Sequence, residues 1–268
     1  MAKLEDLPDE VILKVFGNLQ FPDLLRCGRV SKRIKRVSND KAVWENINLC
    51  RKRVPRNFLQ CILAKDCKYL RLNEAWLVPE DLPLLNYLPF ELELRSKLIE
   101  LDLSWLKCRT EDIEVILASC HSLEKLSLAD AAITSKMIHS ISTQNGTTLQ
   151  SLNLNICKGL GLESIQQILT QCVKLKEVNF QNTRLSEATE NYLAEQMPSW
   201  VEKVDIGTLN RYFSDQNIMW IQTNCPKWFH YRMEPHRVLG RTCSLRVCIF
   251  HSHILIKRSR NISLVRIP

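Results

Sequence analysis

One apolar pattern recurs along most of this 268-residue chain and limits what the chain can fold into. Each copy has an apolar residue, two variable residues, a second apolar residue, one variable residue and a third apolar residue. The clearest copies centre on Leu101, Leu126, Leu152, Val178 and Val204, so the pattern returns every 25 or 26 residues. Alternation of this kind predicts one short strand per copy, and the long period indicates small units that bury their apolar faces against neighbouring units.

This spacing is typical of leucine-rich repeats, which combine one short strand and one helix per unit. We therefore predict an α/β fold, a curved solenoid with parallel strands on the concave face and helices on the convex face. The series extends to Ile47 and Leu70 on one side and to Tyr231 on the other, which gives roughly eight units. Hydroxyl residues that suit helix starts precede the intervening apolar stretches, namely Thr110, Ser135, Ser186 and Ser214.

The first fifty residues have a different pattern, that of three short helices. Pro8 and the two acidic residues after it favour a helix start, and Gly17 favours its end. Two further helices are expected after Pro22 and after Gly28. The apolar arc of the first helix is wide, because Leu13 lies off its main stripe. A unit this small cannot bury all of that surface, so the surplus packs either on the rest of the chain or on a partner.

The order of motifs in this segment resembles an F-box. The matching residues are Leu7, Pro8, Glu10, Ile12, Phe16, Leu19, the run Pro22-Asp23-Leu24-Leu25, the run Val30-Ser31-Lys32-Arg33, and Trp44. An F-box followed by leucine-rich repeats is characteristic of the F-box/leucine-rich-repeat family, whose members are receptor subunits of SCF-type cullin-RING ubiquitin ligases. The resemblance divides the chain into an F-box at 1–49, leucine-rich repeats at 50–233 and a basic, irregular tail at 234–268.

The resemblance also implies partners. An F-box binds a Skp-type adaptor and, through it, the cullin and RING subunits, while the repeats recruit a protein substrate. The adaptor contacts that it implies are Leu7, Pro8, Ile12, Phe16, Leu19, Asp23, Leu24, Val30, Lys32 and Trp44. Many members of the family have tryptophan after the Lys-Arg pair, where this chain has Ile34, so we expect somewhat weaker adaptor binding.

Polar residues alternate with the apolar strand anchors and should point out of the core onto the concave face. We expect a substrate to contact Glu100, Asp102, Trp105, Lys125, Asn153, Asn155, Glu177, Asn179 and Gln181. A solvated face without a ligand would have the same composition, and a repeat scaffold that binds a partner without ligase assembly is the alternative function. The proline-rich stretch 78–91 interrupts the series, either as a partner-binding loop or as an irregular packed repeat.

Several classes of protein are disfavoured. The chain has only 7 glycines and no glycine-rich phosphate loop, Gly-x-Ser-x-Gly elbow or His-Glu-x-x-His pair, so we expect neither catalysis nor a cofactor. The net charge of +8 falls almost entirely after residue 231, where eight basic residues and one acidic residue give +7, so a nucleic-acid-binding body is not expected. No apolar run approaches the roughly 20 residues of a membrane span, and no signal peptide is evident; we expect the cytoplasm or nucleus.

The 11 cysteines are expected to be reduced thiols. Cys120, Cys172 and Cys225 precede strands at one repeat position and Cys157 follows a strand, so they are interpreted as small buried apolar residues. In the tail, the spacing of Cys243, Cys248, His251 and His253 fits no zinc pattern, and we expect no metal. The tail is predicted to be an irregular terminus, with interfacial or nuclear-targeting roles for its basic cluster as alternatives.

Overall fold

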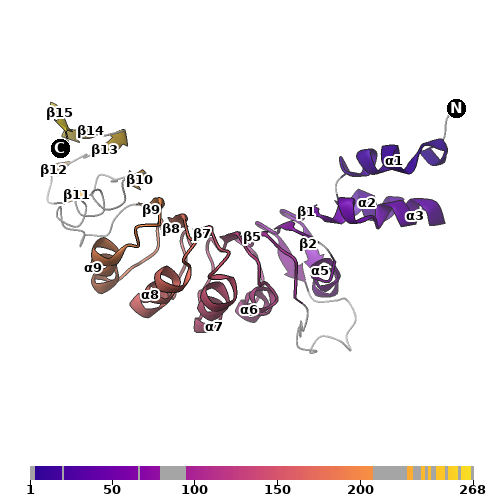
Figure 1. The fold of residues 1–268 in the computed structure, drawn as a ribbon, viewed down its shortest axis with the longest axis horizontal. Coiled ribbons are helices and arrows are strands. Elements are labelled where there is room, and N and C mark those ends of the chain that lie inside the picture. The colour runs from indigo at the N-terminus through magenta and orange to yellow at the C-terminus, as the bar shows by residue number, and fades with distance from the viewer. Residues whose placement is uncertain are drawn as a thin grey trace. The chain divides into compact units, whose positions relative to one another are not determined.

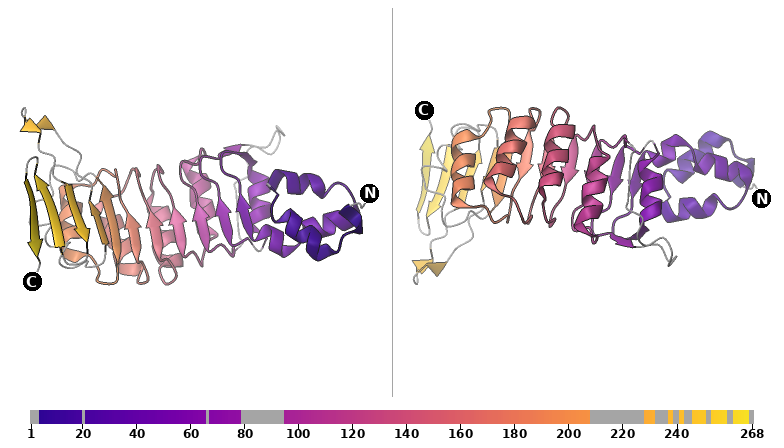
Figure 2. Two further views of the ribbon diagram at one scale, coloured as in Figure 1. Left: turned by 90° about the horizontal axis from the view of Figure 1, so that it is seen from above. Right: turned by 90° about the horizontal axis from the view of Figure 1, so that it is seen from below.

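The computed structural model describes residues 4–19, 21–65, 67–78, 95–207, 228–231, 237–238, 241–242, 246–250, 253–258 and 261–266. After residue 205 it describes the backbone alone. The chain forms two compact units, residues 1–126 and residues 127–268. Figures 1 and 2 show the helices and strands of both units.

The first unit begins with short helices. A single 3₁₀ turn, η1 (Leu4–Asp6), precedes α1 (Asp9–Phe16), α2 (Phe21–Cys27), α3 (Lys32–Ser38) and α4 (Lys41–Trp44). Pro8 is the residue before α1, and both acidic residues lie in its first turn, as predicted. The Ser31 hydroxyl accepts a hydrogen bond from Ile34 N at 3.3 Å and so caps α3. The three predicted helices are therefore present, and the short helix α4 follows them.

Parallel strands follow in the same unit. Their order is β1 (Asn46–Asn48), β3 (Tyr69–Arg71), β5 (Glu100–Asp102) and β6 (Lys125–Ser127), and the register aligns Ile47 with Leu70 and Leu70 with Leu101. A second parallel ladder pairs β2 (Arg53–Pro55) with β4 (Trp76–Val78). Helices α5 (Arg56–Leu63) and α6 (Thr110–Ala118) lie on one side of the strands (Figure 1). The interrupting stretch at 79–94 lies outside the described residues, so its alternatives stay predictions.

The second unit repeats this arrangement. Its parallel strands are β7 (Ser151–Asn153), β8 (Glu177–Asn179), β9 (Lys203–Gly207) and β10 (Trp228–Tyr231), in that order. The helices are α7 (Ser135–His139), which continues as the π-helical turn η2 (Ser140–Gln144), α8 (Leu162–Gln171) and α9 (Glu187–Gln196). Leu152, Val178 and Val204 are in register and buried, as the sequence pattern predicts. Both units confirm an α/β fold with parallel strands and helices alongside.

The helix starts differ in detail from the sequence prediction. Ser186 caps α9, as predicted, by accepting a hydrogen bond from Thr189 N at 3.3 Å. Helix α7 is capped by Thr134 instead of Ser135, because Thr134 has the extended backbone that a cap requires. At α6, Asp112 Oδ2 accepts a hydrogen bond from Arg109 N at 3.1 Å, so Thr110 is already inside the helix. Ser214 lies outside the described residues.

Several strands of the parallel sheet end in the same kind of turn. The side-chain oxygens of Asn48, Asp102, Asn153 and Asn179 each accept a hydrogen bond from the backbone N–H two residues later. Three residues after the strand, the backbone adopts a positive φ of 53 to 67° without glycine, at Arg51, Glu74, Trp105, Asp130, Ile156 and Asn182. This left-handed conformation is unfavourable for residues with a Cβ, so each of these six repeats has backbone strain at one position.

The tail differs from the irregular backbone that the sequence predicted. Its described residues form a hairpin of β11 (Arg237–Val238) and β12 (Arg241–Thr242), and an antiparallel sheet of β13 (Arg246–Phe250), β14 (His253–Arg258) and β15 (Asn261–Arg266). The physical reason lies in composition, because isoleucine, valine and phenylalanine are frequent in these runs and favour strands. The division at residues 49 and 233 stays a prediction.

Candidate protein-binding surfaces

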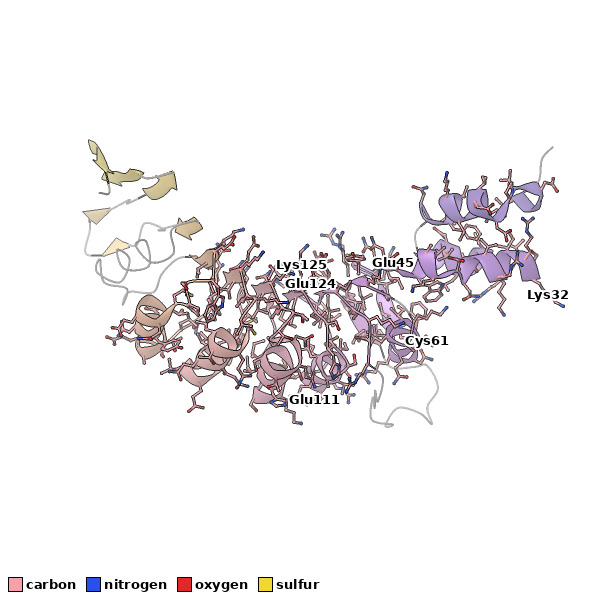
Figure 3. The ribbon with its side chains drawn as sticks, in the orientation of Figure 1. Lys32, Glu45, Cys61, Glu111, Glu124 and Lys125 are labelled. Carbon is pink, nitrogen blue, oxygen red and sulfur yellow. The ribbon has the colours of Figure 1, made fainter. Side chains whose placement is uncertain are left out.

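The predicted adaptor contacts divide into buried and accessible residues. Ile12, Phe16 and Leu24 are almost completely buried inside the F-box helices, and Trp44 is 5% exposed. Leu7, Leu19 and Asp23 are half-buried, whereas Pro8, Val30 and Lys32 are exposed. Figure 3 shows Lys32 at the end of α3 that lies away from β1. The structure therefore assigns four of the ten predicted residues to the internal packing of the F-box.

Other apolar residues of the F-box are accessible, and sequence reasoning did not select them. Val11 is 40% exposed, Val15 is 42% exposed and Leu25 is 39% exposed. Val11 and Val15 are four residues apart on α1, so they lie on one face of that helix, while Ile12 and Phe16 lie on the buried face. The wide apolar arc of the first helix was the sequence signal for this second apolar face.

A carboxylate fixes α1 against α3. Arg33 Nε and Nη2 donate hydrogen bonds to Asp9 Oδ1 at 3.0 and 2.7 Å, and Arg36 Nη2 donates to Asp9 Oδ2 at 2.5 Å. Arg33 Nη2 also donates to Leu7 O at 2.7 Å. The pKa of Asp9 lies below its usual value. The hydrogen bonds from Arg33 contribute most to this shift, and the charges of Arg33 and Arg36 add to it. This network orients α1 with Val11 and Val15 exposed.

The F-box joins the repeats through a short, well-connected junction. Helix α4 ends at Trp44 and β1 begins at Asn46, so no linker separates them. The Trp44 indole Nε1 donates a hydrogen bond to Ser38 O at 2.9 Å. Lys65, which follows α5, places its Nζ 3.3 Å from the centroid of the Trp44 ring and donates to Asn39 Oδ1 at 3.0 Å. Trp44 is therefore a junction residue, which is why it is buried.

In the first unit, the predicted substrate face contains an ion pair. Lys125 Nζ lies 2.5 Å from Glu100 Oε1 between neighbouring strands. Figure 3 shows Lys125 on the strand side of the unit and Glu111, at the start of α6, on the helix side. Asp102 accepts the hydrogen bond of its turn, and Trp105 is exposed at a left-handed position. Glu100 and Lys125, two of the four substrate contacts predicted in this unit, therefore form an ion pair with each other.

In the second unit, three predicted residues lie around one hollow of about 180 Å³ on strands β7 to β9. It is lined by Ser151, Leu152, Asn153, Glu177, Val178, Asn179, Lys203 and Asp205. The Oδ1 atoms of Asn153 and Asn179 are engaged by their turns, and Asn153 Nδ2 donates to Ser127 Oγ at 2.9 Å. Asn155 and Gln181 lie in those turns and are half-buried. The charged side chains in its lining are those of Glu177, Lys203 and Asp205.

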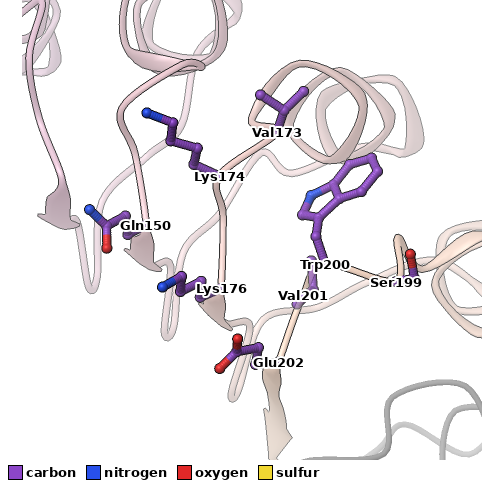
Figure 4. Close-up of a pocket in the computed structure, with 8 residues that line it drawn as sticks. All are labelled: Gln150, Val173, Lys174, Lys176, Ser199, Trp200, Val201 and Glu202. Carbon is purple, nitrogen blue, oxygen red and sulfur yellow. The ribbon is translucent and has the colours of Figure 1, made fainter.

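A larger hollow of about 470 Å³ lies where the chain enters β8 and β9 (Figure 4). Its lining combines exposed apolar side chains with charged ones: Gln150, Val173, Lys174, Lys176, Ser199, Trp200, Val201 and Glu202. Trp200 and Val173 are about half exposed. Sequence reasoning did not select this site, although Trp200, directly before the strand anchor Val201 and outside the repeat pattern, was an available signal.

The repeat cysteines have the environment of buried apolar residues. Cys67, Cys120, Cys157 and Cys172 are buried, and burial raises the pKa of Cys67 and Cys172 to about 12 and that of Cys157 to about 11. Such thiols are poor nucleophiles and poor metal ligands at neutral pH. Where side chains are described, no cluster of three metal-ligating residues occurs. Cys225 and the four tail residues considered for zinc lie outside the described side chains.

Comparison with known proteins identifies both segments. An F-box-like family model matches residues 4–50, and the model of the SKP2 LRR domain matches residues 46–265. Human F-box/LRR-repeat protein 12 is 34% identical over 77 residues, which cover 27% of this chain and 24% of that protein. The mouse protein of the same name is 43% identical over 49 residues, 18% of this chain and 15% of its own length. The alignments thus span less than a quarter of each relative.

The fold and these matches define the class as an F-box/leucine-rich-repeat protein. The repeat model alone covers well over half of the chain. The chain therefore belongs to the family of the SKP2 leucine-rich-repeat domain, with an F-box-like segment before it. Among the helices within the described ranges, none combines the length and apolar character needed to cross a bilayer.

Proposed function

We propose that this protein is a substrate receptor of an SCF-type cullin-RING ubiquitin ligase. F-box domains in general bind Skp-type adaptors, which connect them to the cullin and RING subunits. The observation that supports this proposal most directly is the exposure of three apolar side chains of the F-box, Val11 and Val15 on one face of α1 and Leu25 on α2. Exposed apolar side chains gathered on a small helical unit are characteristic of a surface that a partner covers.

In this proposal the protein has no catalytic role of its own. The ubiquitin thioester belongs to another subunit, and this chain supplies proximity and orientation. The short junction at Trp44 transmits the orientation of the bound adaptor to the first repeats, because α4 runs into β1 and Lys65 closes over the joint. The strand-side hollow with Glu177 and Lys203 is the proposed contact for a protein substrate, in the cytoplasm or nucleus.

The adaptor arm is tested by substitutions on exposed residues. Replacement of a buried residue such as Phe16 by aspartate would unfold the F-box and would not isolate binding. We expect Val15→Asp with Leu25→Asp to reduce capture of the purified adaptor at least tenfold, with the thermal unfolding midpoint unchanged. Val173→Asp, at an exposed apolar residue in the second unit, is the matched control and should bind as wild type does.

The alternative is a repeat scaffold that works without ligase assembly. It predicts that the wild-type chain does not capture the adaptor at all, or that the double variant captures it undiminished. Either result would reject the receptor proposal. Proximity labelling in cells with and without proteasome inhibition then identifies the substrates, because proteins destroyed after ubiquitination accumulate next to the receptor only when the proteasome is blocked.

A further inference from the structure

A row of three side chains crosses the second strand ladder of the first unit. Arg53 on β2 is in register with Trp76 on β4, and Trp76 forms a parallel bridge with Lys107 in the next repeat. The backbone holds this row firmly, since Trp76 N donates to Lys52 O at 2.9 Å and Lys107 N donates to Ala75 O at 2.8 Å. The row is therefore part of the regular repeat structure.

The two cations of this row lie near the central indole. Lys107 Nζ is 4.4 Å from the centroid of the Trp76 ring, and Arg53 Cζ is 6.0 Å from it. Both distances fit cation–π interactions, which attract a cation to the ring face and restrict its position. Trp76 nevertheless remains 46% exposed, and Arg53 and Lys107 are exposed as well. The row thus presents two positioned cations and an accessible aromatic surface together.

The acids described near the row offset its positive charge only in part. Glu74 lies close in sequence, and Arg51 Nε and Nη2 donate to its two carboxylate oxygens at 2.9 and 3.0 Å. The hydrogen bonds from Arg51 and, more weakly, the charges of Arg51 and Lys107 lower the pKa of Glu74, so one carboxylate is shared by two cations. Within the part of the chain that the structure describes, Arg53 and Lys107 form no ion pair. Cations that are positioned but unpaired are available to a carboxylate from another molecule.

We propose that the row Arg53, Trp76 and Lys107 binds an acidic segment of a partner protein. Carboxylates pair with the two cations, and an apolar side chain between them packs on the exposed part of Trp76. Aromatic and arginine residues together contribute strongly to protein interfaces. The binding itself does not depend on the proposed ligase function. Ubiquitination of the bound partner would be a consequence of the proposed ligase function and rests on it.

The spacing of the row restricts the sequence that it accepts. Neighbouring strands are about 4.8 Å apart, so Arg53 and Lys107, two strands apart, are separated by roughly 10 Å along the ladder. An extended peptide advances about 3.3 Å per residue, so carboxylates three residues apart match that separation. A nucleic acid fits less well. Its phosphates are closely spaced and require a larger basic surface than the two cations of this row provide.

The experiment measures binding of a defined probe to the full chain. The probe is a fluorescein-labelled peptide of three Glu-Leu-Tyr-Glu repeats, and its counterpart has glutamine in place of glutamate. Fluorescence anisotropy at about 50 mM NaCl keeps screening moderate. We expect Arg53→Glu with Lys107→Glu to raise the Kd at least tenfold, and Trp76→Ala to raise it about threefold. Lys158→Glu with Arg184→Glu, the charge-matched control at exposed basic residues of the second unit, should change it less than twofold.

Several outcomes would overturn the proposal. These are equal binding of the glutamine peptide, equal binding by the Arg53 and Lys107 double variant, or binding of an oligouridine through these cations without binding of the peptide. If the charge reversals lower the unfolding midpoint, Arg53→Gln with Lys107→Gln replaces them and should still raise the Kd at least threefold. Wild-type affinity in that variant would also reject the proposal. Adaptor capture, measured separately on the same proteins, should be unchanged.

Discussion

Lys65 Nζ lies 3.3 Å from the centroid of the Trp44 ring, so a residue that follows the first repeat helix covers the last aromatic residue of the F-box. Desolvation at this position lowers the pKa of Lys65. The indole of Trp44 is simultaneously fixed by its hydrogen bond to Ser38 O. One side chain thus links α3, β1 and α5 at the point where the two folds meet.

Substitutions at this junction should cost stability in a graded order. Trp44→Ala removes a buried indole and should lower the free energy of unfolding by about 3–5 kcal/mol. Lys65→Met keeps the packing of the alkyl chain but removes the cation, and should cost about 0.5–2 kcal/mol. Urea denaturation checks both values. Lys158→Met, at an exposed lysine elsewhere, should change nothing beyond error, and equal losses in Lys65→Met and Lys158→Met would contradict the cation–π assignment.

A buried ion pair connects the start of α5 to the start of α6. Arg56 Nη2 lies 2.7 Å from Asp112 Oδ2, and both side chains are largely excluded from solvent. Asp112→Ala leaves Arg56 unpaired and removes the acceptor for Arg109 N, so we expect a loss of about 3–5 kcal/mol. Glu111→Ala, at the exposed neighbouring residue, should cost less than about 1 kcal/mol. Similar losses in the two variants, measured by urea denaturation, would show that Asp112 acts only through helix capping charge.

The asparagines of the strand face support turns. Asn179 Oδ1 accepts a hydrogen bond from Gln181 N at 2.8 Å. Asn179→Ala removes this acceptor and should lower stability by about 1 kcal/mol, whereas Asn179→Asp keeps it and should remain within about 0.5 kcal/mol of wild type. Thermal unfolding distinguishes the two variants. A loss in the aspartate variant as large as in the alanine variant would mean that the amide nitrogen, and not the turn, stabilises this residue.

Ile156 is a β-branched residue with a φ of 60°. This conformation is especially unfavourable for a branched side chain, and asparagine tolerates it better. Asn182 already occupies the same position in the next repeat. We expect Ile156→Asn to raise the free energy of unfolding by about 0.5–1 kcal/mol. Lys158→Asn, at a neighbouring residue outside the set with positive φ, should give no gain, and a loss at Ile156 would indicate that its apolar contacts outweigh the strain.

Glu190 makes stability depend on pH. It is 2% exposed, Oε2 lacks a hydrogen-bond partner among the residues described, and burial, with a smaller effect of Glu187, raises its pKa to about 7. The unfolded carboxyl ionises near 4.5, so the folded state binds the proton more tightly. The contribution of Glu190 to stability is therefore fully present below about pH 4.5, declines as pH rises to about 7, and stays low above it.

Replacement of this carboxyl removes the dependence. Glu190→Gln should be more stable than wild type above pH 7, by at most about 3 kcal/mol, and the difference should shrink toward pH 5. Unfolding midpoints measured at pH 5 and pH 8 test the sign. Glu195→Gln, at an exposed residue of the same helix, should show no such difference. A Glu190→Gln variant that loses stability equally at both pH values would contradict the raised pKa.

The repeat pattern predicted the strands well because its apolar positions are the residues whose side chains are buried. Leu101, Leu152 and Val178 are buried at strand centres, as their spacing requires. The tail was predicted less well, since no repeat constrains it and an apolar run of that length is compatible with several backbones. The sequence predicted Ser135 as a helix start, but the neighbouring Thr134 also has a hydroxyl, and the extended backbone of Thr134 makes it the cap.

The surfaces were harder to predict than the fold. The F-box motif includes both Phe16, which is buried, and Val30, which is exposed, because the spacing of a motif does not distinguish internal packing from contact with a partner. The asparagines of the strand face were expected to bind a peptide, but polar strand residues serve turns as well. The pairing of Glu100 with Lys125 and of Lys107 with Trp76 depends on the register between repeats, which a single strand's pattern does not contain.

The six left-handed residues affect how the turn edge of the repeats can change during evolution. None of them is glycine, so each of these six repeats has a side chain at this point of its turn. The residue types found there are arginine, glutamate, tryptophan, aspartate, isoleucine and asparagine. The backbone tolerates all of them at a modest cost in strain. New chemical character can therefore appear at this edge by single substitutions, without a change in the length or register of any repeat. That freedom makes the turn edge a natural place to diversify or engineer recognition.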